Sequence, residues 1–578
     1  MPGYVFLTQG DLTRIRCDYI VYTTDGRGRK GDLAHAFEGI RADFTSSVKS
    51  WVDGLKPRAA VGDAKTLTEL PGGRKVIGVV STRDFKTTDT ASAEAAVRAA
   101  INCVPEGEPR RVIAFPAVNF GKGGNREARL KSAMAQLQAA SNALETRSDL
   151  DAVFVTYDPS SYRIFQQARA SLSINKVEPG IPQPPAALID RLRRGQCVTF
   201  VGAGVSMESG LPSWQQLIEY LEAQAGIEPV APSKDVDLMA RAQALRDSGK
   251  GHEVDGWVRS KVSGPIDGAH ELLPSALHYT LASLPVRFYF TTNYDGLLES
   301  TLKSARRFPV KVVGRPEVAG TGDSGGTYVV KLHGDAAEPI AAQSDPGLVL
   351  SLHDYQQFEA NRGSMAALLR SLLLNQSFLF VGYGLRDPNI KALYGEVQKL
   401  LLGAKPMAYA VTFGDPPNSS EFPGLETINV ADSREVRIFF DRLADAANRR
   451  PPLFLARDAH KPRDGSTSDV PRLGKLAKRL HESGMELQRS ICDGKPLNET
   501  ESRLALGVAA FLVDHGWRPK GCTIKSLADR ACGKTTPAEL RREWFRFVLP
   551  YCRDASEVRA VWTELEKADS GSPAIDPP

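Results

Sequence analysis

A glycine turn follows an apolar strand in the middle of the chain. Residues 197–201 read Cys-Val-Thr-Phe-Val, and Gly202-Ala203-Gly204-Val205-Ser206 follows directly. Because glycine has no Cβ, backbone N–H groups in such a turn approach a ligand closely. A strand that leads through glycine into a helix is typical of sites that bind phosphate or a dinucleotide. The same pattern also occurs as an ordinary strand-to-helix turn, so its meaning depends on the motifs that follow it.

Length and composition predict a globular protein of several domains. The 578 residues exceed what one hydrophobic core holds, and 42% apolar with 24% charged residues is ordinary for soluble proteins. No apolar run is long enough to cross a bilayer and no signal peptide is visible, so we expect a cytoplasmic protein without membrane contact. Seven scattered cysteines without a CxxC pair are typical of a reducing compartment. The net charge of +5 gives no case for nucleic acid.

Alternation of apolar strands with amphipathic helices predicts an α/β multidomain protein. The first unit, residues 1–175, has expected strands at 5–7, 19–22, 75–80, 112–115 and 152–156, and expected helices at 92–102 and 127–144. Four prolines between 179 and 185 predict a stiff linker over residues 176–185. The second unit, residues 186–450, has expected strands at 197–201, 288–291, 328–332, 378–381 and 407–412. A linker at 451–470 and a helical region at 471–578 follow.

Three more segments of the second unit place small or polar residues directly after an expected strand. Asn293 and Asp295 follow the strand at 288–291, His333 follows the strand at 328–332, and Gly382 and Gly384 follow the strand at 378–381. Ligands of open parallel sheets bind beyond the carboxyl ends of the strands. Together with the turn at 202–206, these segments therefore predict one common crevice.

The residue types in this crevice suit the cleavage of a dinucleotide. The backbone amides of 202–206 and a helix beginning near Ser213 suit a diphosphate. The amide of Asn293 suits a ribose hydroxyl or a water molecule, His333 is a base near neutral pH, and Asp295 is a partner for a carboxamide. Each residue alone also has a structural explanation, as a cap, a turn former or a buried histidine. The prediction therefore depends on their convergence.

Taken together, these motifs resemble the sirtuin family. The quoted segments are Gly-Ala-Gly-x-Ser at 202–206, Thr-x-Asn-x-Asp at 291–295, His-Gly at 333–334, Asp-Tyr-x-x-Phe at 354–358 and Phe-Val-Gly-Tyr-Gly-Leu-Arg-Asp-Pro-Asn-Ile at 380–390. The last four, including Thr-Thr-Asn-Tyr-Asp at 291–295, are most similar to a prokaryotic sirtuin-like branch found in antiviral defence proteins. The resemblance implies a Rossmann-like parallel sheet that binds NAD as its substrate. It implies that Asn293 and His333 are catalytic, and that the nucleotide contacts Gly202, Ala203, Gly204, Ser206, Trp214, Asp295, Gly382, Gly384 and Asp387.

One departure from the sirtuin pattern changes the expected chemistry. Sirtuin deacylases carry a four-cysteine zinc module after the His-Gly segment, but no cysteine lies between His333 and Phe380. We therefore expect no metal and no acyl-lysine groove. Water remains as the acceptor, which predicts hydrolysis of NAD to nicotinamide and ADP-ribose.

The start of the chain resembles a macro domain, a family that binds ADP-ribose. The motif survives as Gly10-Asp11-Leu12-Thr13, followed later by a glycine loop at 121–124. By this resemblance, Asp11 binds adenine and the loop glycines Gly121 and Gly123 bind the diphosphate. The asparagine segment of the family is replaced by Tyr-Thr-Thr-Asp at 22–25, so hydrolysis of ADP-ribose is not implied. A degenerate domain kept as a scaffold is the alternative.

The combined prediction is a regulated NAD hydrolase that acts in antiphage defence by depleting NAD. An ADP-ribosyltransferase acting on a macromolecule and a non-enzymatic NAD or ADP-ribose sensing module are the alternatives. We expect ADP-ribose or a related nucleotide signal at the first unit, a phage-derived or host protein as trigger, and a homo-oligomer. The helical region at 471–578 carries no catalytic motif and suits partner binding or oligomerisation.

Overall fold

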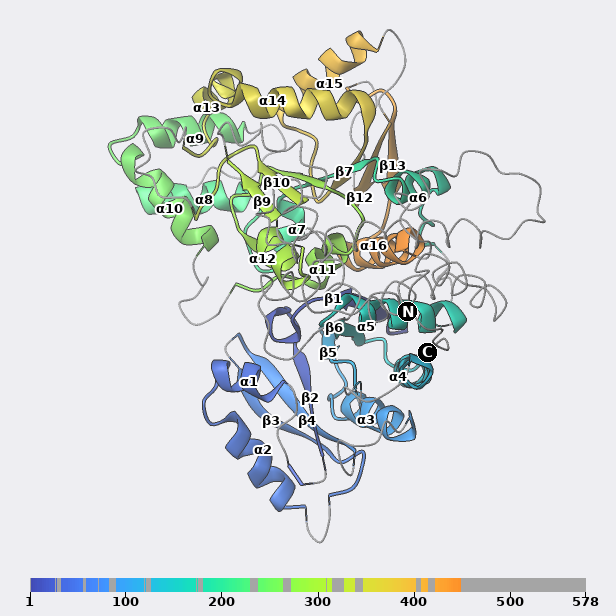
Figure 1. Ribbon diagram of the computed structural model, residues 1–578. Coiled ribbons are helices and arrows are strands. Elements are labelled where there is room, and N and C mark those ends of the chain that lie inside the picture. Colours follow the sequence, from blue (N-terminus) through green and yellow to red (C-terminus); the bar gives the residue numbers. More distant parts are fainter. Residues whose placement is uncertain are drawn as a thin grey trace, which may run out of the picture. The chain divides into compact units, whose positions relative to one another are not determined.

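The computed structural model describes the chain between residues 2 and 448, with gaps. The described residues are 2–25, 27–28, 33–55, 59–70, 72–82, 90–118, 120, 126–172, 174, 180–228, 237–263, 272–307, 309–313, 327–337, 347–401, 407–413 and 421–448. Four sequence predictions lie outside them: the linker at 451–470, the helices of 471–578, part of the proline-rich linker, and the glycine loop with Gly121 and Gly123. The described residues form two sheets with helices on both faces of each (Figure 1).

The first sheet has six strands in the order β1-β6-β5-β2-β4-β3. They are β1 (Val5–Gln9), β2 (Tyr19–Asp25), β3 (Ala64–Leu70), β4 (Arg74–Thr82), β5 (Arg111–Phe115) and β6 (Leu150–Thr156). All neighbours are parallel except β3 and β4. The five strands expected here from the sequence are confirmed. The sequence pattern does not predict β3, because this edge strand is half-exposed and lacks a continuous apolar run.

Helices from both halves of the chain cover the first sheet. One face packs against α3 (Thr90–Asn102), α4 (Arg126–Leu144) and α5 (Pro159–Ser171), which confirms the helices expected at 92–102 and 127–144. The other face packs against α1 (Ala34–Ile40), α2 (Phe44–Asp53), α11 (Ala276–Ala282) and α16 (Ser433–Asn448). All seven residues of β6 are buried, as expected for a strand that is covered on both faces.

The second sheet has seven parallel strands in the order β13-β12-β11-β7-β8-β10-β9. They are β7 (Cys197–Val201), β8 (Phe288–Thr291), β9 (Pro309–Val312), β10 (Thr327–Lys331), β11 (Ser377–Val381), β12 (Ala408–Thr412) and β13 (Leu425–Asn429). The five strands expected from the sequence are confirmed. The edge strands β9 and β13 are short and partly exposed, so they carry little apolar signal.

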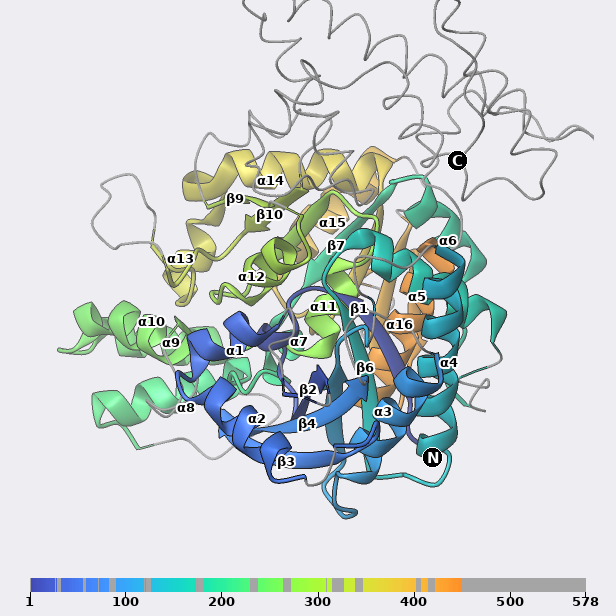
Figure 2. The ribbon, with the colours of Figure 1, turned by 60° about the horizontal axis from the view of Figure 1, so that its bottom comes forward.

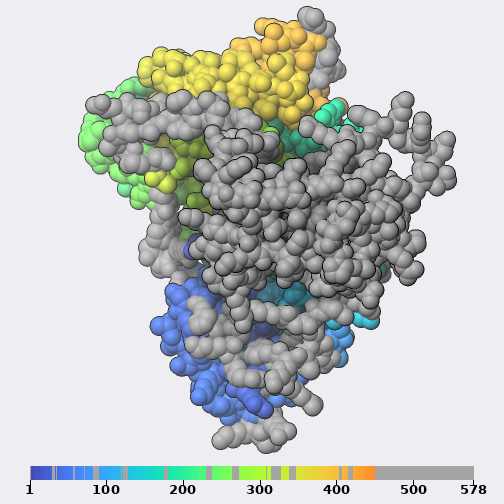
Figure 3. All heavy atoms as spheres, in the orientation of Figure 1, coloured from blue at the N-terminus to red at the C-terminus, as the bar shows by residue number. Residues whose placement is uncertain are grey.

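The helices of the second half form two layers around this sheet. One layer contains α6 (Ala186–Arg193), α11, α12 (Leu297–Ser304) and α16. The other contains α14 (Phe358–Asn375) and α15 (Pro388–Leu400), whose outer surface is visible in Figure 3. Beside the sheet lie α8 (Trp214–Ala225), α9 (Leu238–Asp247) and α10 (Val254–Ser263), which share a separate apolar cluster. No helix among the described residues combines the length and apolarity needed to cross a membrane.

Residues 1–157 and 161–450 form one compact unit, in which α11 and α16 lie between the two sheets (Figures 1 and 2). The contact includes buried, paired charges. Asp441 on α16 accepts hydrogen bonds from the Tyr4 hydroxyl at 3.0 Å and from Arg169 Nη1 at 2.6 Å. Asp151 on β6 accepts from Arg434 Nη2 at 3.1 Å. Because a buried charge needs a partner, these pairs determine where α16 meets the first sheet.

We predict that Asp441→Ala destabilises the protein far more than the loss of an exposed ion pair. The variant leaves Arg169 and Tyr4 buried without their main acceptor, which costs about 3–5 kcal/mol of unfolding free energy. The matched control is Asp190→Ala, which removes a pair with Arg194 at 2.8 Å that is half-exposed on both sides. We expect about 0.5 kcal/mol or less for this control. Urea unfolding measures the free energy of unfolding of both variants. Equal losses of stability would contradict the role of Asp441 as the acceptor for buried donors.

Candidate functional site

Four neighbouring strands of the second sheet end at one edge. In the register of the sheet, Val381 of β11 pairs with Val201 of β7, Val201 pairs with Thr291 of β8, and Thr291 pairs with Lys331 of β10. Asn293 lies two residues after Thr291 and His333 lies two residues after Lys331, and these two strand residues are paired on adjacent strands. Adjacent strands are about 4.8 Å apart, so the register brings these two residues to the same part of the edge.

Strands that follow β7 in the sequence lie on both sides of β7 in the sheet. From β7 the chain continues to β8 and β10 on one side, and it later returns to β11 and β12 on the other side. A crevice at the point where the strand order reverses is where doubly wound sheets bind their ligands. The turn after β7 and the loop after β11 lie on the two sides of this point.

The glycines of these two loops pack against each other. The N–H of Gly202 donates to Val381 O at 2.9 Å, and the N–H of Gly204 donates to Gly382 O at 2.9 Å. A Cβ on Gly202 would lie 2.4 Å from Gly382 O, and one on Gly382, whose φ is +59°, would lie 2.5 Å from Val205 N. The sequence prediction assigned the backbone amides of 202–206 to a diphosphate. In the structure, the amide of Gly202 binds the last residue of β11, and the amide of Gly204 binds the loop that follows it.

A hydrogen-bond chain holds the side chain of Asn293. Its Nδ2 donates to Gly202 O and to Ser206 Oγ, both at 3.1 Å, and Ser206 Oγ donates to Asp295 Oδ2 at 2.9 Å. Because the carbonyl of Gly202 can only accept, this contact defines which end of the Asn293 amide is the donor. The opposite atom, Asn293 Oδ1, is buried and has no hydrogen-bond partner in the part of the chain that the structure describes.

His333 contacts the loop that follows β11. Its Nε2 lies 3.0 Å from Asp387 Oδ2, and its ring meets the ring of Tyr355 edge-on at 5.2 Å. Asp387 also caps α15, because its Oδ1 accepts from the N–H groups of Asn389 and Ile390. Leu385 in the same loop has φ of +53°, which is strained for a side chain with a Cβ. The loop therefore holds Asp387 against the histidine at a cost in backbone energy.

Tyr355, which contacts His333, and Tyr383, which interacts with Asp387, remain protonated phenols. Burial, and then the charge of Asp387, hold the pKa values of Tyr355 and Tyr383 well above the ordinary value. His333 is 5% exposed and Asn293 is 9% exposed. The two predicted catalytic side chains are thus mostly buried.

Sequence reasoning missed Lys331, which organises the loop after β8. This lysine is fully buried at the end of β10, donates to the carbonyls of Tyr294 and Asp295, and pairs with Glu299 at 3.3 Å and Asp335 at 3.5 Å. A charge inside the apolar run Val-Val-Lys-Leu is the signal that could have identified it, because a buried ammonium needs such partners.

The remaining predicted residues lie at different places. Ala203 begins the five-residue helix α7 (Ala203–Met207), and Trp214 begins α8 and is half-buried in the apolar cluster of α8–α10. Ser213 caps α8 in a capping box with Gln216, so part of the helix start expected to bind a diphosphate is satisfied internally. Gly384 is exposed, with open space around it.

Asp11 lies on the first sheet, not at this edge. Its Oδ1 accepts from the N–H and the hydroxyl of Thr13, and its own N–H donates to Ser304 Oγ of α12 at 2.7 Å. The carboxylate therefore caps the 3-10 turn η1 (Leu12–Arg14), while the backbone contacts the second half of the chain. Among the described residues, no group of three or more His, Cys, Asp or Glu side chains could hold a metal ion.

A protein-family model and several curated proteins match part of the chain. Residues 287–431, which include Asn293, His333 and the loop after β11, match the SIR2-like domain family. The NAD(+) hydrolase ThsA of Enterococcus faecium is 28% identical over 213 residues, which are 37% of this chain and 42% of that protein. Defense-associated sirtuin 2 of Bacillus subtilis is 28% identical over 211 residues, which are 36% of this chain and 20% of that protein. The chain thus spans less than half the length of these curated relatives.

Among solved structures, macrodomains are similar to part of the chain. A mutant Oceanobacillus iheyensis macrodomain is 18% identical, covers 28% of this chain and 90% of that chain, and has a TM-score of 0.25. The macrodomain of Thermus aquaticus DarG is 18% identical, covers 27% of this chain and 98% of that chain, and has a TM-score of 0.22.

We predict that Gly202→Ala destabilises the protein by about 1–3 kcal/mol, because the new Cβ overlaps the Gly382 carbonyl and must push the two loops apart. Gly384→Ala is the control, since a Cβ there meets nothing within 4 Å. We expect its unfolding free energy to stay within about 0.5 kcal/mol of wild type. Similar stabilities of the two variants, measured by urea unfolding, would show that the loops are not packed as described.

Proposed function

We propose that the protein hydrolyses NAD to nicotinamide and ADP-ribose at the edge formed by Asn293 and His333. The observation that carries the proposal is the buried Oδ1 of Asn293, which lacks a donor although the rest of its amide is held. A water molecule or a ribose hydroxyl supplies that donor. The SIR2-like match over the same residues, and the names of the curated NAD hydrolases, support NAD as the substrate.

The residues at this edge suit a dissociative cleavage. As the bond between nicotinamide and ribose breaks, nicotinamide leaves as a neutral molecule with the bonding electrons, and positive charge develops on the ribose. Water then adds to the ribose carbon and loses one proton, which His333 accepts. The products are nicotinamide, ADP-ribose and that proton. Asn293 orients the water or the ribose hydroxyl, and Asp387 positions the imidazole of His333.

The biological setting is proposed from the relatives. We propose that NAD depletion serves antiphage defence, with a phage-derived or host protein as trigger and a homo-oligomer as the active form. The domain division at 175–186 and an ADP-ribose-type ligand for the first unit are also proposals. They rest on the proline-rich segment and on the motif at 10–13. Because uncontrolled NAD loss is toxic, the activity needs a control element.

The purified full-length protein should release nicotinamide and free ADP-ribose from NAD. Asn293→Ala and His333→Ala should each lower the rate of nicotinamide release at least about 100-fold, because each removes a group that acts on the reacting water or ribose. Chromatography of the products, with NAD labelled in its adenine, measures both. Label that stays on a macromolecule would instead indicate ADP-ribosyl transfer, and intact NAD that is bound would indicate a sensing module.

The matched control for these variants is His353→Ala. His353 lies exposed on α13 (Leu352–Gln356) and should retain the wild-type rate. All variants should keep the wild-type melting temperature within a few degrees. Full activity of both site variants would refute the assignment of the site.

Asp387 provides a test of how His333 is positioned. Asp387→Asn keeps a good cap for α15 but replaces the carboxylate beside Nε2. We expect kcat for NAD to fall about tenfold or more with KM nearly unchanged, because a wrongly held imidazole is a poor base for a bound substrate. Asp387→Ala should show the same kinetic loss and, in addition, lose about 1 kcal/mol of stability with the cap. An unchanged kcat in Asp387→Asn would remove Asp387 from the mechanism.

A further inference from the structure

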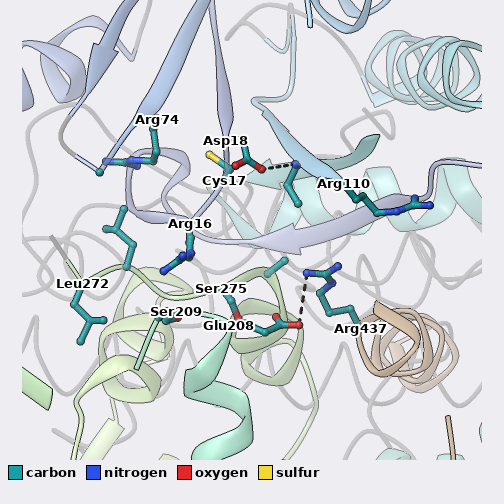
Figure 4. A pocket seen from close by; sticks show the side chains of 15 residues that line it. Arg16, Cys17, Asp18, Arg74, Arg110, Glu208, Ser209, Leu272, Ser275 and Arg437 are labelled. Atoms are coloured by element: carbon teal, nitrogen blue, oxygen red, sulfur yellow. Dashed lines mark hydrogen bonds and ion pairs between the residues drawn. The ribbon is translucent and has the colours of Figure 1, made fainter. Parts of the chain in front are cut away.

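A cavity of about 480 Å³ lies between the loop that precedes β2 and the segment that follows α7 (Figure 4). Its size falls within the range of pockets that hold small molecules, about 300–1,000 Å³. One side is formed at the amino-terminal ends of β2, β4 and β5. It therefore lies at the opposite end of these strands from the carboxyl end of β5. The other side is formed by residues 208–210 and by the start of α11.

Positive charge predominates in the lining. Four arginines and two acids line the cavity, namely Arg16, Arg74, Arg110 and Arg437 against Asp18 and Glu208. Asp18 Oδ2 accepts from Val112 N at 2.7 Å, and Arg110 pairs with Asp151 at 3.2 Å. Glu208 lies 3.5 Å from Arg437, and its carboxylate oxygens have no hydrogen-bond partner among the described residues. A site with this charge excess attracts an anion, and guanidinium groups suit phosphate oxygens in particular.

Two buried polar groups on opposite sides of the cavity lack partners. Arg74 is 2% exposed; its Nη1 donates to Thr13 O at 2.7 Å, but its Nε and Nη2 have no acceptor among the described residues. Ser209 is also 2% exposed, and no described residue provides a partner for its hydroxyl. Unsatisfied buried groups are rare because each costs free energy. Both residues line one cavity, so a ligand that shifts the lining on binding would supply the missing partners.

The cavity also adjoins the elements that hold Asn293. Glu208 directly follows α7, and Ser206 within α7 binds both Asn293 and Asp295. The Nε of Arg437 also has no acceptor within the described ranges, and the 3.5 Å between Arg437 and Glu208 is longer than a hydrogen bond. Burial raises the pKa of Glu208, so its charged form is held weakly. An anion that pairs with Arg437 would therefore displace Glu208 and change the position of α7.

We propose that this cavity is a regulatory site for a phosphate-bearing ligand of the nucleoside diphosphate class, and that its occupancy alters the site at Asn293 through α7. The phosphates contact Arg16, Arg74 and Ser209, and the nucleoside lies against the apolar side chains of Leu272 and Leu273. The effect on NAD cleavage rests on the proposed function, whereas the binding site does not.

Calorimetric titration of the full-length protein with ADP tests the binding site. Arg16→Gln removes one guanidinium from an exposed position of the lining, and Arg14→Gln is the matched control, an exposed arginine two residues away that does not line the cavity. We expect Arg16→Gln to weaken ADP binding at least tenfold and Arg14→Gln to leave it within about twofold of wild type. Inorganic pyrophosphate should compete with ADP, because the phosphates provide the charged contacts.

Two further measurements test the coupling to α7. ADP should change deuterium uptake by the peptide covering residues 203–210 in wild type and Arg14→Gln, but not in Arg16→Gln. At saturating NAD, ADP should also change the rate of nicotinamide release at least threefold in the same two proteins.

Three outcomes would contradict different parts of the proposal. Absence of ADP binding to wild type, or equal binding by Arg16→Gln and Arg14→Gln, would overturn the binding site. Binding without a change in deuterium uptake would overturn the coupling. Failure to cleave NAD would instead refute the proposed function, since the binding and exchange results do not depend on turnover.

Discussion

The contact between the glycine turn after β7 and the loop after β11 is the constraint on which the site depends. These loops come from strands on the two sides of the point where the strand order reverses, and their backbones touch where Gly202 and Gly204 meet Gly382. No side chain fits between them. This close approach places the carbonyl of Gly202 where it accepts a hydrogen bond from Asn293. The loop after β11 also contains Asp387, which lies beside His333. The positions of the side chains at the site therefore depend on the packing of these two backbone segments.

The two sheets of the chain are coupled by helices that belong to both cores. Apolar residues of α16 pack in the core of the second sheet, while Ile438 of the same helix packs against the first sheet. Buried charges reinforce this contact at Asp441 and Asp151. These pairs attach α16 to the first sheet, and α11 packs in the cores of both sheets. Both helices border the cavity next to α7.

Much of the site is predictable from the sequence because its polar residues directly follow apolar strands. Asn293, His333 and Gly382 each come one or two residues after a strand whose apolar run is unambiguous, and parallel strands end together. The sequence pattern does not predict the edge strands β3, β9 and β13, because partly exposed strands do not require a continuous run of apolar residues. The structural role of Lys331 was not predicted, because a charged residue in a strand is recognised as important only when its buried partners are known.

The sequence by itself determined the order of strands and helices, the polar residues at the strand ends and the absence of a cysteine cluster between His333 and Phe380, since these follow from local patterns of apolar and polar residues. Only the tertiary structure decided that the glycine amides bind a neighbouring loop, that Asp387 faces His333, and that arginines from both halves of the chain line one cavity. Such contacts join residues up to hundreds of positions apart, and no local pattern encodes which distant group will satisfy a buried donor or charge.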